Sequence, residues 1–124
     1  MKKSALLVDT DVLIYYLNRR QYRHYLESEN WQVYYSVVTK EELLAKQGIS
    51  NRERRTIALL LRRYRRINLT SSVAVRYAEL QRQYPSLERN DALIAATALV
   101  RRLPLLTGNQ RHFRIVAELD LLSP

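Results

Sequence analysis

Ala5-Leu6-Leu7-Val8-Asp9-Thr10-Asp11 sets a short apolar run directly before two acidic residues. A run of this length that is closed by polar residues is typical of a buried strand, so we expect a strand over residues 4–8. In open α/β sheets, functional side chains gather at the carboxyl ends of the strands. Asp9 and Asp11 therefore mark the start of a candidate site.

Strand-like and helix-like segments alternate along the rest of the chain. Runs rich in β-branched and aromatic residues predict strands, and apolar residues three and four apart predict helices. Further strands are expected over 31–38, 67–69 and 103–107, with an edge strand near Ile115. Helices are expected over 11–17, over 22–29, from Thr39 to about Gly48, over 50–66, from Ser71 or Ser72 to Tyr84, from about Asn90 to Arg102, and near Gln110. This alternation predicts an α/β fold with a mainly parallel sheet, and the length predicts one domain over residues 1–124.

The chain carries a formal net charge of +9. Such a charge favours RNA, DNA or an acidic protein as partner, although simple solubility is the alternative. Much of it falls in one segment, at Arg52, Arg54, Arg55, Arg62, Arg63, Arg65 and Arg66. The helix expected there begins with a capping box of Ser50 and Glu53. Its arginines are candidates to bind phosphates, and a merely solvated helix face remains the alternative.

Composition excludes several classes of protein. The chain has no cysteine, so it has neither a disulfide framework nor a thiolate zinc site. Its two glycines are too few for a P-loop or a dinucleotide fingerprint, and its two histidines are expected to be structural rather than zinc ligands. No apolar stretch is long enough for a transmembrane helix, and the N-terminal run is too short for a signal peptide. We therefore expect a cytoplasmic protein that does not enter the membrane.

Two further acids lie at expected element boundaries beside apolar segments. Glu42 follows the second expected strand, and Asp91 opens a segment that is otherwise almost entirely apolar up to Ala98. Mg²⁺ prefers oxygen ligands and is usually held by a few carboxylates. A metal that activates water and stabilises the leaving oxygen would hydrolyse a phosphodiester, which suits a basic protein acting on a polyanion.

Each acid also has a structural interpretation. Asp9 fits the N-cap of the helix that follows the first strand. Glu42 fits the third position of a capping box begun by Thr39, and Asp91 fits a first-turn acid that complements the helix dipole. The functional interpretation is favoured by the three acids taken together, because all of them lie at element boundaries beside core segments.

Four segments, in their order and spacing, resemble the PIN domain and specifically the VapC-like ribonuclease toxins of type II toxin–antitoxin systems. They are Leu7-Val8-Asp9-Thr10-Asp11-Val12-Leu13-Ile14, Ser36-Val37-Val38-Thr39-Lys40-Glu41-Glu42-Leu43, Asp91-Ala92-Leu93-Ile94-Ala95-Ala96-Thr97-Ala98 and Leu106-Thr107-Gly108-Asn109-Gln110-Arg111-His112-Phe113. The similarity covers essentially the whole chain. It implies a PIN-like three-layer α/β/α fold and a metal-dependent endoribonuclease.

The resemblance also implies the site. Asp9, Glu42 and Asp91 match the metal-binding acids of the family, with Mg²⁺ or Mn²⁺ as the metal. Asn109 occupies a fourth catalytic position that is often aspartate, and its neutral carbonyl oxygen is a weaker ligand for Mg²⁺. Asp11 is accessory. The implied partners are an RNA substrate, a cognate antitoxin protein and a second copy of the chain in a homodimer.

Other interpretations stay open from the sequence. Asp9-Thr10-Asp11 echoes the nucleophile loop of haloacid dehalogenase-type phosphotransferases, but Leu13 stands where that family has threonine or valine. A catalytically degenerate PIN module that binds RNA or a protein partner is the main alternative, because Asn109 replaces an acid. Glu41 and Glu88 are expected to be solvated. The tyrosine pairs 15–16 and 34–35 are expected in the core or a dimer surface, with base stacking as the alternative.

Overall fold

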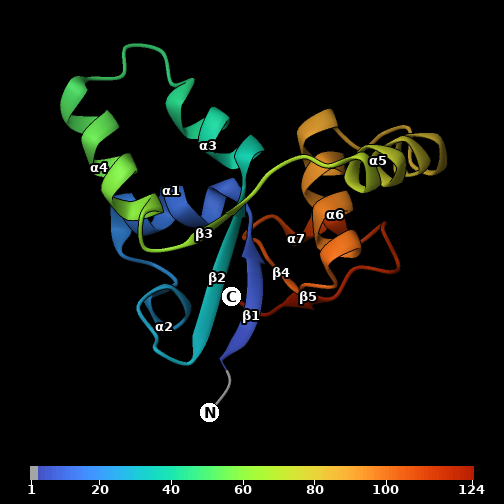
Figure 1. Cartoon of the computed structure of the whole chain (residues 1–124), viewed down its shortest axis with the longest axis horizontal. Coiled ribbons are helices and arrows are strands. Elements are labelled where there is room, and N and C mark those ends of the chain that lie inside the picture. The colour runs from blue at the N-terminus through green and yellow to red at the C-terminus, as the bar shows by residue number, and fades with distance from the viewer. Residues whose placement is uncertain (1–2) are drawn as a thin grey trace.

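A computed structural model describes residues 3–124, which form a five-stranded sheet in the order β3-β2-β1-β4-β5. Every pair of neighbouring strands runs parallel. The strands are β1 (Ser4–Val8), β2 (Trp31–Ser36), β3 (Arg65–Ile67), β4 (Leu105–Leu106) and β5 (Leu121–Leu122). Figure 1 shows β1 and β2 side by side through the middle of the molecule. The expected α/β fold with a parallel central sheet is confirmed.

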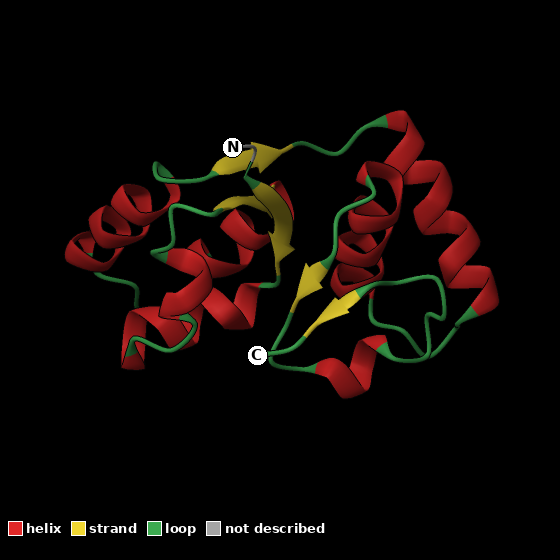
Figure 2. Cartoon of the chain, turned by 90° about the horizontal axis from the view of Figure 1, so that it is seen from below, coloured by secondary structure: helices red, strands yellow, loops and turns green. Residues whose placement is uncertain are grey.

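Helices cover both faces of the sheet, which gives three layers (Figure 2). They are α1 (Thr10–Arg19), α2 (Arg23–Leu26), α3 (Val37–Leu44), α4 (Asn51–Leu61), α5 (Ser71–Gln83), α6 (Arg89–Arg101) and α7 (Gln110–Phe113). Leu6 and Val8 of β1 pack among α1, α2 and α4. Leu7 points to the opposite face and packs with residues of α5, α6 and α7, as the two-residue period of a strand requires.

Helix α6 is the most deeply buried helix of the fold. Each residue from Ala92 to Ala98 is buried, and its alanines let α5 pack closely beside it. The one hydroxyl in this run, Thr97 Oγ1, donates to the carbonyl of Leu93 at 2.7 Å and needs no partner outside the helix. The central position expected for this segment is confirmed, and it holds the first turn of α6 rigidly against the sheet.

The second strand is shorter than the sequence predicts. The strand ends at Ser36, whose Oγ accepts a hydrogen bond from Val38 N at 3.1 Å and so caps α3. Thr39 therefore lies inside the helix, and the capping box predicted between Thr39 and Glu42 is wrong. The β-branched pair Val37-Val38 suggested strand, but the serine cap overrides that preference.

Three predictions after residue 50 are also corrected. The helix expected over 50–66 ends at Leu61, because residues 65–67 pair with β2 as β3, so the strand predicted over 67–69 begins two residues earlier. The edge strand predicted near Ile115 is wrong, because Ile115 is exposed in a turn and the edge strand is β5. The described part of the chain contains no helix that is both long enough and apolar enough to cross a membrane.

The capping box that begins α4 is confirmed and can be tested directly. Ser50 Oγ accepts from Glu53 N at 3.0 Å, and Glu53 Oε1 accepts from Ser50 N at 3.3 Å. Ser50→Ala removes the first of these bonds, so we expect a loss of about 1 kcal/mol in the free energy of unfolding. Urea denaturation measures it, with Ser72→Ala on the exposed face of α5 as control. An unchanged midpoint for Ser50→Ala would contradict the prediction.

Candidate active site

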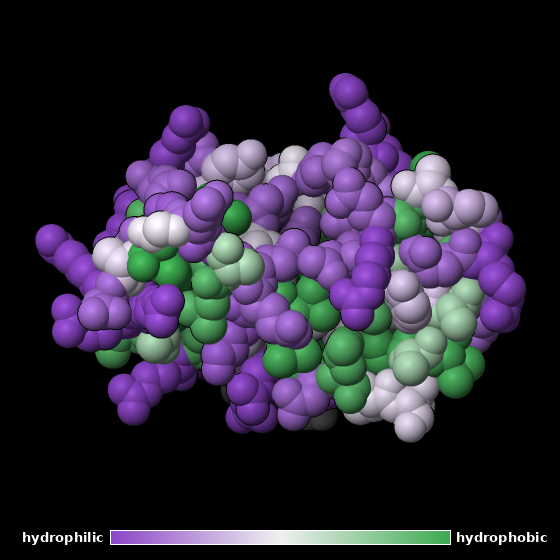
Figure 3. All heavy atoms as spheres, turned by 90° about the horizontal axis from the view of Figure 1, so that it is seen from above, coloured by the Kyte–Doolittle hydropathy of each residue, from purple (hydrophilic) through white to green (hydrophobic). Residues whose placement is uncertain are grey.

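The sheet order brings the ends of three strands together. β1 lies between β2 and β4, so the segments that follow these strands emerge at one edge. Asp9 follows β1, Glu42 lies on the helix that follows β2, and Asn109 lies in the loop after β4. Asp91 joins them from the first turn of α6. Figure 3 looks down on this side of the molecule, where hydrophilic side chains fill the middle of the face.

Asp9 is a charged side chain that the fold has buried, with only 6% of its surface exposed. Its Oδ1 accepts from Thr10 N at 2.8 Å, which caps α1 as the structural interpretation predicted. Its Oδ2 accepts from Thr107 Oγ1 at 2.8 Å, and Thr107 Oγ1 accepts in turn from Asn109 N at 2.9 Å. The carboxylate therefore caps a helix and also joins β1 to the loop after β4.

Two buried threonines connect Glu42 to the start of α1. Thr10 Oγ1 donates to Glu42 Oε1 at 2.6 Å and lies 2.9 Å from the hydroxyl of Thr39. These contacts tie the start of α1 to α3. Apart from this hydrogen bond, the side chain of Glu42 is exposed to solvent.

Asp91 and Asn109 meet through His112. His112 Nδ1 lies 3.5 Å from Asp91 Oδ2 and 2.9 Å from Asn109 Nδ2. Asn109 and His112 are three residues apart, so the short helix α7 presents both on one side. His112 was expected to be structural, and its contact with two candidate site residues went unpredicted. The three-residue spacing was the only signal that the sequence offered.

Burial and mutual repulsion raise the pKa values of the clustered acids. Burial, followed by the charge of Asp11, raises the pKa of Asp9 from 3.8 to about 7, against the hydrogen bonds from Thr107 and Thr10. Burial raises the pKa of Asp11, with a smaller contribution from Glu42. Burial, followed by the charge of Glu88, raises the pKa of Asp91. Each of these carboxylates would therefore be stabilised in its charged form by a nearby cation.

The donor set fits a hard divalent cation by its chemistry. Carboxylates and the amide oxygen of Asn109 are the oxygen ligands that Mg²⁺ prefers. Within residues 3–124, however, no three His, Asp or Glu side chains converge tightly enough to form a ready-made metal cage. Asp9 and Glu42 are instead each hydrogen-bonded to a threonine, Thr107 and Thr10 respectively.

The remaining candidates lie around this centre. Asp11 is half-buried, and its Oδ1 accepts from Gly108 N at 3.3 Å. Glu41 and Glu88 are exposed as expected, although Glu88 is close enough to act on the pKa of Asp91. Tyr16 and Tyr35 are in the core, as expected, whereas Tyr15 is exposed and Tyr34 is only partly buried.

A basic α/β/α protein with acids gathered at the carboxyl edge of its parallel sheet has an architecture that suits a nuclease. The PIN domain matches residues 6–119, and the chain belongs to the PIN domain family. The resemblance read from four short segments is thereby confirmed.

Proteins of known name match this chain over most of its length and most of their own. The chain is 34% identical to Ribonuclease VapC10 of Mycobacterium tuberculosis, covering 92% of the chain and 90% of that protein. It is 26% identical to Ribonuclease VapC1 of Methanocaldococcus jannaschii, covering 97% and 87%. A toxin–antitoxin complex from Klebsiella pneumoniae contains a chain of similar structure, with a TM-score of 0.75 and 33% identity over 87% of this chain and 89% of that one. VapBC2 from Rickettsia felis, bound to a promoter DNA fragment, shares the fold with a TM-score of 0.83 at 22% identity, covering 95% and 97%.

The raised pKa of Asp9 gives a stability prediction. Between about pH 4 and pH 7, the folded protein keeps a proton on Asp9 that the unfolded chain has lost. The parent protein should therefore lose stability from this group as the pH rises through that window. Asp9→Asn removes the charge and keeps a cap-forming side chain. In EDTA at pH 7.5, we expect the variant to be more stable by an amount of the order of 3 kcal/mol.

Thermal or urea unfolding of both proteins at several pH values measures the difference. We expect it to shrink toward zero below about pH 3, where Asp9 is protonated in both the folded and the unfolded state. Asp120→Asn, an exposed aspartate at the start of β5, is the matched control. A variant that is clearly less stable than the parent at pH 7.5 would show that the Asp9 carboxylate stabilises the fold in its charged form.

Proposed function

We propose that this chain is a metal-dependent endoribonuclease that hydrolyses RNA phosphodiester bonds, and that it is the toxin of a toxin–antitoxin pair. Residues 1–124 act as one PIN-like nuclease domain. Two relatives over nearly its full length are ribonucleases by name. The observation that carries the proposal is the match of residues 6–119 to the PIN domain, and the buried Asp9 at the carboxyl edge of the sheet supports it.

Asp9, Glu42 and Asp91 would hold Mg²⁺, or Mn²⁺ in its place, and Asn109 would offer a weaker carbonyl oxygen. The bound metal supplies a cation that lowers the pKa of water and neutralises charge on the leaving oxygen. The surrounding side chains then have orienting roles. Thr107 fixes Asp9, Thr10 fixes Glu42, and His112 contacts both Asp91 and Asn109.

The two alternatives from the sequence fare differently. Membership of the PIN family sets the haloacid dehalogenase-type interpretation aside. A catalytically degenerate module that binds RNA or a partner remains the second candidate, because Asn109 stands where the family often has an acid.

Protein partners follow from the same relatives. The Klebsiella pneumoniae structure is a toxin–antitoxin complex, so we propose a cognate antitoxin for this chain. The net charge of +9 would attract an acidic segment of such a partner. The homodimer implied by the resemblance stays a prediction, and sedimentation of the isolated protein tests it.

A basic hollow between α3 and α4 is a candidate for the RNA backbone. It has a volume of about 460 Å³ and is lined by Tyr35, Lys40, Arg55, Ala58, Leu59, Leu61 and Arg62. Lys40 lies on α3 two residues before Glu42, so the hollow and Glu42 lie on different sides of the same helix. Arg65 and Arg66, expected on the same helix as the other arginines, lie on β3 instead. Only part of the arginine cluster therefore faces this hollow.

The first experiment is cleavage of mixed tRNA and rRNA. We expect cleavage with Mg²⁺, none with EDTA, and a loss of the order of 100-fold or more for Asp91→Asn and Glu42→Gln, because each removes a proposed ligand of the metal. Glu41→Gln, at the exposed neighbouring position, is the matched control and should keep full activity. A folded Asp91→Asn variant that cleaves as fast as the parent would overturn the assignment.

The basic hollow gives a second prediction. Replacing Lys40, Arg55 and Arg62 with glutamine should weaken RNA binding and flatten its dependence on salt. The slope of log affinity against log salt should fall by about 0.7 for each phosphate that the variant no longer neutralises, or about 2 in total. Fluorescence anisotropy between about 50 and 300 mM salt measures the slope. Glutamine at Lys3, Arg101 and Arg102, which lie just before β1 and at the C-terminal end of α6, is the control of equal charge. Equal slopes for the two triple variants would place the RNA backbone elsewhere.

A further inference from the structure

Two tyrosine rings form an aromatic surface beside the acids, which we call the tyrosine platform. Tyr15 of α1 and Tyr22 at the N-cap of α2 have ring centroids 6.5 Å apart and planes inclined by 29°. A Cβ atom at Gly108 would lie 2.8 Å from the Tyr22 hydroxyl, 3.1 Å from Asp11 Oδ2 and 3.2 Å from Tyr15 Cε2. The platform therefore lies against the loop that carries Thr107 and Asn109.

The fold leaves this aromatic surface partly open to water. Tyr15 is 39% exposed, whereas the next residue, Tyr16, is 2% exposed and belongs to the core. Tyr22 is half-buried. Rings that pack in a core have no face left for a ligand, but Tyr15 keeps much of its surface free within contact distance of the loop that carries Thr107 and Asn109.

The backbone at Tyr22 is held in an uncommon conformation. Its φ of 67° and ψ of 19° lie in the left-handed region, which bulky residues seldom adopt and which costs of the order of 1 kcal/mol. The carbonyl of Tyr22 accepts hydrogen bonds from Tyr25 N and Leu26 N, both at 3.0 Å. Such strain persists only where surrounding contacts fix the segment.

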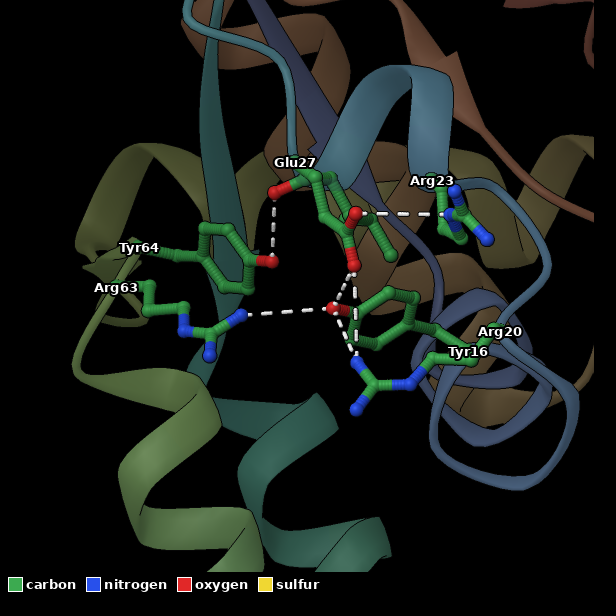
Figure 4. Close-up of polar contacts among 7 residues, drawn as sticks. Tyr16, Arg20, Arg23, Glu27, Arg63 and Tyr64 are labelled. Atoms are coloured by element: carbon green, nitrogen blue, oxygen red, sulfur yellow. Dashed lines mark hydrogen bonds and ion pairs between the residues drawn. The ribbon is translucent and has the colours of Figure 1, made fainter.

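A polar cluster supplies those contacts (Figure 4). Glu27 accepts from the Tyr16 hydroxyl at 2.5 Å and pairs with Arg20 and Arg23, both at 3.6 Å. Tyr64 donates to the carbonyl of Leu26 at 3.0 Å. The segment from Tyr22 to Glu27 is thereby tied to α1 and to the residues after α4. Tyr22 is preorganised in this position, so little order has to be gained when a ligand binds.

We propose that the tyrosine platform stacks on an unpaired nucleobase of the RNA strand that lies at the acids, and so positions the adjacent phosphodiester. The proposal rests on the proposed function, because it takes the polyanion at this site to be RNA. The acids repel phosphates, so attraction at this point needs an uncharged contact. Tyrosine rings provide one, since every base has a face that can stack on them.

Binding without cleavage tests the platform. In EDTA, fluorescence anisotropy compares oligo(A), oligo(U) and an abasic phosphodiester strand of equal length. We expect Tyr15→Ala to weaken binding of oligo(A) by roughly 5- to 100-fold and oligo(U) by less, with no change for the abasic strand. Tyr15→Phe keeps the ring and should bind like the parent. Ile14→Ala, a neighbour of similar exposure at 41%, is the matched control.

Gly108→Ala perturbs the platform without replacing either tyrosine. The added Cβ would displace the Tyr22 hydroxyl and press on Tyr15 and Asp11, so we expect the same selective loss for base-containing strands. Circular dichroism confirms that each variant is folded.

The outcomes separate the two proposals. Equal losses for base-containing and abasic strands, or full affinity of Tyr15→Ala for every strand, overturn the platform and leave the rings to a protein partner. Base-dependent binding by a parent protein that cleaves no RNA in Mg²⁺ would overturn the proposed function and leave the platform standing.

Discussion

The hydrogen bonds that Asp9 accepts from Thr10 N and Thr107 Oγ1 hold the centre of this structure together. One oxygen caps the start of α1, and the other holds the loop after β4. A single buried carboxylate therefore connects the end of the central strand β1 to both α1 and that loop. Burying a charge this deeply is costly, and its pKa of about 7 expresses that cost. The hydrogen bonds recover part of it, and a cation at the site would recover more.

Around Asp9, the fold places acidic and basic side chains in different regions of the surface, although the chain as a whole is basic. The chain is strongly basic, yet its buried and half-buried acids gather at one sheet edge, while arginines and Lys40 line the hollow between α3 and α4. This separation follows from topology. All the strands run parallel, so the residues that follow β1, β2 and β4 emerge together, and the arginines of α4 stay on the outer layer.

Much of this was accessible from the sequence, for physical reasons that differ from element to element. β1, α5 and α6 carry strong local patterns, and each was predicted close to its observed bounds. Helix α3 was misplaced because Val37-Val38 favours strand locally, whereas the Ser36 cap decides the boundary. β5 was missed because two residues carry no periodicity and only their pairing with β4 makes them a strand. The contact of His112 with Asp91 depends on long-range packing, which no local pattern encodes.

The acids of the site also affect how strongly RNA can bind there. Carboxylates that hold a metal repel the polyanion they are proposed to cut, so affinity must come from contacts outside the metal site. The basic hollow offers long-range attraction that salt weakens, and it acts on any polyanion. The tyrosine platform offers short-range stacking that salt affects little and that requires an unpaired base. A strand that satisfies both contacts lies across the acids with a base held to one side, so a paired helix, which exposes no free base face, would be a poor fit.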